Sequence, residues 1–214
     1  MWQIFKHEIR LMLREPRFLM AFLLPPLVLL GAQAFLFSQT AGEAPQLDGM
    51  MLLLVGALIT TMSVTLTADS FAGERERNTL ELLLALPLKP EHLFWGKLSA
   101  ILVLPLVLAF AAQGILWTFF SQVGWYYLIT AWIYSLALCL FITALALYIS
   151  LRSATVRSAA QINVIFVLFF LFLTNFGGVY YFNHPAFPAV ALSFSLLGSW
   201  IITRGARRRF LRLG

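Results

Sequence analysis

Long apolar runs alternate with short polar segments along the whole chain. The runs cover about residues 18–37, 50–71, 92–120, 125–151, 159–182 and 187–203, and each is close to the roughly 20 residues that a helix needs to cross a bilayer. The 214 residues are 61% hydrophobic and only 11% charged, whereas soluble domains have about 25% charged residues. The pattern predicts an all-α integral membrane protein with six transmembrane helices in one domain, residues 1–214.

Two stretches modify this pattern at its ends. Before the first run, residues 2–14 place Trp2, Phe5 and Ile9 on one helical face and basic or polar residues on the other, which is typical of a helix that lies in the membrane interface. We expect this amphipathic helix within residues 1–17, and a first transmembrane helix after it rather than a cleaved signal peptide. In the fifth run, the sequence Asn-Phe-Gly-Gly at 175–178 predicts that the helix loosens or breaks near the outer face.

The charged segment at residues 72–91 separates the second and third runs. Within it, Asn78 followed by Glu81 has the spacing of a capping box, and Pro87 must end any helix that begins there. The helix between these signals carries a row of leucines, namely Leu80, Leu82, Leu83, Leu84 and Leu86. A short capped helix with an apolar face, held between two membrane spans, predicts a protein partner for that face.

The basic residues indicate how the chain crosses the membrane. All 15 Lys and Arg lie in the N-terminal segment, in the segment between spans two and three or just after it at Lys97, in the segment between spans four and five, or in the tail at 204–214. The three loops in between contain none. Because cytoplasmic loops are enriched in Lys and Arg, we expect both termini to be cytoplasmic. Topology thus accounts for the net charge of +6, and we expect no nucleic acid partner.

The sequence contains no motif for ATP binding or catalysis. It lacks a GxxxxGK[ST] phosphate loop, and no cluster of His or carboxylate residues lies within the apolar runs. We therefore expect no enzymatic activity, no bound cofactor and no metal. Asp69 is the one acidic residue inside a span, so an ion-coupled carrier is an alternative; a pair with a nearby arginine, Arg75 or Arg77, is the simpler interpretation.

Hydroxyl side chains lie on one face of the second span. Thr60, Ser63 and Thr67 recur at intervals of three and four residues, which places them on the same side of a helix. Such residues hydrogen-bond and pack between membrane helices. They are also candidates for lining a transport pathway, and the pattern alone does not separate the two roles.

The run ADSFAGERERNTLELLLALPLKPEHLFWGKL, residues 68–98, resembles the segment between the second and third spans of ABC-2-type transporter permeases. The common features are a Glu-rich stretch, a TLE-leucine run and a following Leu-Pro. The six spans, the amphipathic start and the missing phosphate loop agree with this family over the whole chain. Asn78 stands where many relatives have Gly, and both residues suit a helix entry.

The resemblance implies a transport subunit that works with a partner ATPase. The short helix would be the family's coupling helix, which docks on a separately encoded ATP-binding subunit that holds ATP and Mg²⁺. Leu80, Leu83 and Leu84 would fill a groove on that subunit. The polar contacts that fix the register would come from Glu74, Arg75, Glu76, Arg77 and Glu81, and Asn78 would cap the docking helix.

The same resemblance implies the assembly and the membrane. The amphipathic N-terminus would be the connecting helix, and the chain would pair as a homodimer or with a related permease in the plasma membrane of a bacterium or archaeon, exporting its cargo. The alternative within this resemblance is a component like haem exporter B of cytochrome c maturation, acting as a membrane scaffold. The sequence does not identify the cargo.

Overall fold

The computed structural model describes residues 2–14, 31, 45–77, 90–119 and 124–211. Within these residues all regular structure is helical and there is no strand. The elements are α1 (Trp2–Arg14), α3 (Pro45–Thr60), α4 (Met62–Thr67), the π-helical η1 (Ala68–Gly73), α5 (Glu74–Glu76), α7 (Pro90–Phe119), α8 (Trp125–Ser150), α9 (Val156–Asn183) and α10 (Phe187–Phe210). The all-α prediction is confirmed for the described part of the chain.

Five helices in these ranges are long and apolar enough to cross a membrane. They are Gly49–Glu76, Pro90–Thr118, Trp125–Ser150, Val156–Gly178 and Phe187–Phe210, and they correspond to the second to sixth predicted spans. The first predicted span, residues 18–37, lies outside the described residues. Pro105 lies inside α7 without ending it, as membrane helices allow.

The central helical path continues beyond its predicted end. Helix α3 is followed directly by α4, η1 and α5, so the path reaches Glu76 instead of ending near Phe71. Phe71 is almost fully buried, and the charged residues after it find partners on neighbouring helices, as described below. The beginning of the charged segment is therefore a continuation of the span and not a loop.

Helix α9 is also longer and more regular than predicted. The expected break at residues 175–178 is wrong, because α9 is continuous from Val156 to Asn183. A Cβ atom at Gly178 would lie only 3.1 Å from Cγ of Met50. The glycine therefore permits close packing of α9 on α3 and does not interrupt the helix.

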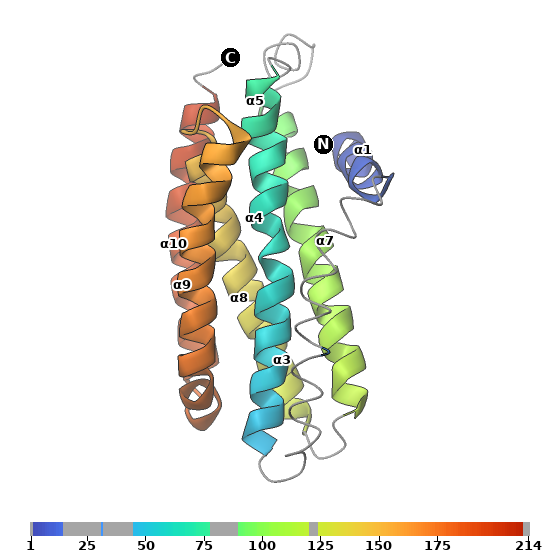
Figure 1. The fold of residues 1–214 in the computed structure, drawn as a ribbon, viewed down its shortest axis with the longest axis vertical. Coiled ribbons are helices and arrows are strands. Elements are labelled where there is room, and N and C mark those ends of the chain that lie inside the picture. Colours follow the sequence, from blue (N-terminus) through green and yellow to red (C-terminus); the bar gives the residue numbers. More distant parts are fainter. Residues whose placement is uncertain (1, 15–30, 32–44, 78–89, 120–123, 212–214) are drawn as a thin grey trace.

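The helices form a bundle around α3 and α4 (Figure 1). Helix α7 lies on one side of this central pair, α9 and α10 lie on the other, and α8 packs behind them. One end of the bundle brings together α1, α5, the start of α7, the connection between α8 and α9, and the end of α10. We call it the basic end, because it holds the described Lys and Arg residues: Lys6, Arg10, Arg14, Arg75, Arg77, Lys97, Arg152, Arg157, Arg204, Arg207, Arg208 and Arg209.

Aromatic side chains fill the core of the basic end. The ring of Phe210 lies 6.0 Å from that of Phe71 and 5.4 Å from that of Phe94. Phe210 is fully buried. Burial of this ring stabilises the part of α10 that extends past residue 203, the predicted end of the span. The first part of the expected basic tail is therefore helical and packed against η1 and α7.

A buried glutamine joins three helices in the interior of the bundle. Nε2 of Gln113 on α7 donates to the carbonyl oxygen of Leu52 on α3 at 2.8 Å and to Oγ of Ser135 on α8 at 2.9 Å. Gly56 lies against this site, because a Cβ atom there would be 2.0 Å from Oγ of Ser135 and 2.2 Å from Nε2 of Gln113. Close approach of α3 thus depends on the missing side chain.

Substitution of Gly56 by alanine tests this packing. We expect Gly56→Ala to destabilise the protein by about 1–3 kcal/mol, because the added methyl group overpacks the site. The measurement is thermal unfolding in detergent. The control is Gly114→Ala on α7, since a Cβ atom there meets nothing within 4 Å; that variant should keep the wild-type melting temperature or raise it slightly. Equal melting temperatures for both variants would contradict the packing described.

Candidate functional site

The side chain at the centre of the basic end is Lys97, on the first turns of α7. Its side chain is only 1% exposed. Its Nζ donates to Oε1 of Glu8 on α1 at 2.8 Å and to Oε1 of Glu74 on α5. We call Glu8, Lys97 and Glu74 the ion-pair triad. It connects three elements that are remote in the sequence.

Burial makes this triad costly to disrupt. The side chains of Glu8 and Glu74 are 13% and 19% exposed, so all three charges are largely withdrawn from water. Removing one partner from a buried ion pair leaves an uncompensated charge in a medium of low dielectric constant. The geometry of α1, α5 and α7 is therefore fixed relative to one another by charge as well as by packing.

The next two residues of the charged segment bind the connection between α8 and α9. Nη1 of Arg75 donates to the carbonyl oxygen of Leu151 at 3.4 Å. The backbone N–H of Val156, the first residue of α9, donates to Oε2 of Glu76 at 2.9 Å. A carboxylate at a helix N-terminus satisfies a free N–H and interacts favourably with the helix dipole. Both arginine and glutamate remain exposed over part of their surface.

Arg77 and Asp69 lie close to the same glycine. Nε of Arg77 donates to the carbonyl oxygen of Gly73 at 3.2 Å. A Cβ atom at Gly73 would lie 2.9 Å from Nη2 of Arg77 and 3.7 Å from Oδ1 of Asp69. Asp69 and Arg77 therefore lie on the same side of this turn, at the basic end.

The remaining residues of the predicted docking helix, Asn78, Leu80, Glu81, Leu83 and Leu84, lie outside the described residues. The chain leaves the described part at Arg77 and returns at Pro90. Both positions belong to the basic end, next to the ion-pair triad (Figure 1). The segment 78–89 is thus attached to the bundle at α5 and at α7, the two elements that Lys97 joins.

The hydroxyl stripe of the second span is buried inside the bundle. Thr60, Ser63 and Thr67 are fully buried, and their hydroxyls donate to carbonyl oxygens of their own helix, at Ala57, Thr60 and Ser63. These contacts satisfy the hydroxyl groups locally and let α4 pack closely on α8. They are the contacts expected of packing residues within one chain.

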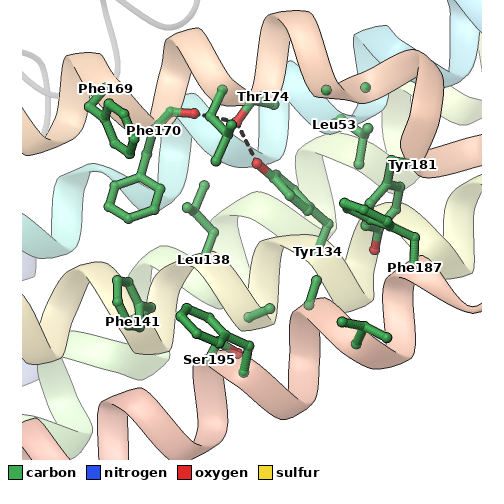
Figure 2. Close-up of a pocket in the computed structure, with 17 residues that line it drawn as sticks. Leu53, Tyr134, Leu138, Phe141, Phe169, Phe170, Thr174, Tyr181, Phe187 and Ser195 are labelled. Atoms are coloured by element: carbon green, nitrogen blue, oxygen red, sulfur yellow. Dashed lines mark hydrogen bonds between the residues drawn. The ribbon is translucent and has the colours of Figure 1, made fainter.

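A cavity of about 460 Å³ lies between α8, α9 and α10. Figure 2 shows aromatic side chains around it, with Phe141, Phe169 and Phe170 towards one end and Tyr181 and Phe187 towards the other. One polar contact lies on its wall, where the hydroxyls of Tyr134 and Thr174 are 2.5 Å apart. No charged side chain lines the cavity, so it suits an apolar molecule and offers little to identify one.

Lys97 and Glu8 are the site residues that sequence reasoning missed. The sequence pattern uses Lys97 only as one of the basic residues that indicate the topology, and it gives Glu8 no role. One signal for Lys97 was available: it follows Leu93 and Phe94 at intervals of four and three residues, which places it on the apolar face of α7. Both leucine and phenylalanine are buried there. A cation on a buried face requires an anion, but the pattern does not say which one.

The described residues contain no group of three or more His, Cys, Asp or Glu side chains that could hold a metal ion. No relative among curated proteins matches the chain. The model of one family does match it, that of the ABC-2 family transporter protein, over residues 2–204. With a match of nearly full length and the membrane-spanning helices described above, the chain belongs to the ABC-2 family as a transporter membrane protein.

Proposed function

We propose that this chain is the permease subunit of an ATP-driven exporter, and that residues 78–86 form the helix through which a separate ATPase subunit drives it. The observation that carries the proposal is the ion-pair triad. Glu74 lies four residues before this segment and Lys97 lies eleven residues after it, and the two side chains are bonded to each other. Both attachments of the segment to the membrane helices are therefore coupled.

This coupling suits the transmission of motion from a docked partner. Helix α5 is the last turn of the central helical path, which runs through the bundle from Pro45 to Glu76. Helix α7 begins on the other side of the segment, and α1 is bonded to the same lysine. A displacement of residues 78–89 would move α1, α5 and α7 together, since separating them would break a buried ion pair.

The residues of the segment divide into two groups by role. Leu80, Leu83 and Leu84 would fill a groove on the ATPase, with Asn78 capping the helix and Glu81 fixing the register. Arg75 and Glu76 hold the end of the span against the connection between α8 and α9. Arg75, Glu76 and Arg77 are also exposed, so they can contact the ATPase as well. ATP and Mg²⁺ would bind only to the partner.

The charge distribution supports a cytoplasmic position for the docking surface. The described Lys and Arg residues gather at one end of the bundle, and the positive-inside rule assigns such an end to the cytoplasm. A soluble ATPase would meet α1 and the segment 78–89 there. Exposed apolar side chains along α9 and α10 would face lipid or a second permease, either an identical copy or a relative. The membrane would be the plasma membrane of a bacterium or archaeon.

The double substitution Leu83→Glu, Leu84→Glu tests the docking helix. We expect the ATPase subunit that co-purifies with the wild-type chain to be lost, because two carboxylates cannot enter an apolar groove without a large desolvation cost. The measurement is affinity purification from host membranes followed by identification of the ATPase and its MgATP hydrolysis. Leu83→Met, Leu84→Met is the control and should retain the partner. Retention by the glutamate variant would refute docking at this site.

Substitution of Lys97 tests the coupling. Lys97→Met should destabilise the protein by about 3–5 kcal/mol, because it leaves two largely buried carboxylates without their cation. The triple variant Glu8→Gln, Glu74→Gln, Lys97→Met removes every charge and should recover most of the stability. If the triad transmits motion, this variant still binds the ATPase but stimulates its hydrolysis several-fold less. Full stimulation by a stable triple variant would limit the triad to a structural role.

A further inference from the structure

A second groove, separate from the ion-pair triad, lies on the outside of the bundle near the basic end. It has a volume of about 420 Å³, within the size range of ligand sites. Helix α8 forms its floor with Leu140, Thr143 and Ala144, while α7 and α10 form its two walls. The groove is therefore a gap between two helices of the bundle, closed behind by a third.

The groove changes from polar to apolar along its length. Its end near the basic end of the bundle is lined by Trp95 of α7 and by Trp200, Arg204 and Arg207 of α10. Deeper in the bundle its walls are apolar, formed by Leu98, Leu102, Leu140 and Leu196. Tryptophan is enriched at the boundary between headgroups and hydrocarbon, so the two tryptophans mark the level at which the groove passes from one to the other.

The length of the groove corresponds to one leaflet of a bilayer. Leu196 and Arg207 are eleven residues apart on α10, which is about 16 Å at 1.5 Å per residue. The hydrocarbon core of a bilayer is about 30 Å thick, so one leaflet contributes about half of that. A molecule that fills the groove from its basic end would reach the middle of the membrane with its apolar part.

The cations at the mouth of the groove have capacity for an anion. The guanidinium group of Arg204 lies over the ring of Trp200, at 3.6 Å from its centroid, and no carboxylate among the described residues forms an ion pair with it. Arg207 pairs with Glu91 through Nη2 at 2.5 Å. Its Nε is buried and has no acceptor in the described part of the chain. Of these two arginines, only Arg207 has a carboxylate partner among the described residues, and that carboxylate lies on α7.

The three helices that line the groove carry no acidic residue besides Glu91. Beyond Glu91 the chain contains no Asp or Glu, while the end of α10 adds Arg208 and Arg209. A second copy of the chain would bring the same basic surface to the groove, which disfavours a symmetric protein contact there. An anion with an apolar body matches the groove, because its charge suits the arginines at one end and its apolar part suits the leucines at the other.

We propose that the groove between α7, α8 and α10 binds one anionic phospholipid from the leaflet at the basic end. Its phosphate group lies at Arg204 and Arg207, and one acyl chain runs along Leu98, Leu102 and Leu196. Arginine guanidinium groups bind phosphate through paired N–H donors, and basic pockets between membrane helices hold anionic headgroups. The site is distinct from the proposed ATPase-docking segment and does not depend on it.

The test is lipid binding to the purified full-length chain in detergent, measured by native mass spectrometry and by the shift in melting temperature. Phosphatidylglycerol is compared with phosphatidylcholine of the same acyl chains. We expect retention and stabilisation by phosphatidylglycerol only. Arg204→Gln should weaken its binding roughly fivefold, as expected for one basic residue at a lipid surface. The matched control Arg208→Gln removes the same charge outside the groove and should leave the affinity unchanged.

A further variant tests the acyl-chain part of the site. Leu102→Trp fills the groove without changing any charge and should also weaken phosphatidylglycerol binding. Three results would overturn the proposal: equal losses in Arg204→Gln and Arg208→Gln, no preference over phosphatidylcholine, or full binding by Leu102→Trp. Inorganic phosphate that competes as well as the lipid would likewise exclude a lipid site. A Ser199→Cys variant that forms disulfide-linked dimers would show that a second copy covers the groove instead.

Discussion

The structure depends on a lysine that is almost completely removed from water and held by two carboxylates from different parts of the chain. A charge buried in this way is tolerated only when its partners are in place, so the positions of α1, α5 and α7 are not independent. Helix α1 is therefore held against the bundle in two ways, by its apolar side chains and by the ion pair of Glu8 with Lys97. Phe5, Ile9 and Met12 pack on the neighbouring core, and Glu8 supplies the charge that apolar contact alone would not provide.

Polar contacts next to the triad fix α5 against the connection between α8 and α9. Glu76 accepts the first free N–H of α9, and Arg75 donates to the carbonyl oxygen of Leu151, the residue directly after α8. Each contact satisfies a backbone group that would otherwise need water. The aromatic cluster of Phe71, Phe94 and Phe210 lies beside these contacts. At the basic end, α1, α7, the connection between α8 and α9, and α10 therefore all contact η1 or α5 or bind a residue that does. The segment at residues 78–89 follows directly after α5.

The sequence was sufficient to predict features that depend on composition along a single helix. The apolar runs located the helices α7, α8, α9 and α10, since crossing a membrane requires about 20 apolar residues whatever the neighbours are. Predictions from the sequence failed at positions where packing between helices determines the structure. Gly177 and Gly178 predicted a break, yet Gly178 serves close contact with Met50. Phe210 stood in a basic tail, and only its partners on η1 and α7 make it a core residue. Glu8 and Lys97 are 89 residues apart, and no local pattern pairs them.

The π-helical turn at Ala68–Gly73 sets the alignment of everything that follows it. Such a turn inserts one residue more than an α-helix would take, which rotates the rest of the helix by about 100°. Without it, Gly73 would occupy the position that now belongs to Glu74, and the carboxylate would point away from Lys97. Formation of the ion-pair triad therefore depends on the number of residues in this turn. A single residue inserted or deleted between Thr67 and Glu74 would separate the partners, although Glu8, Glu74 and Lys97 themselves would be unchanged.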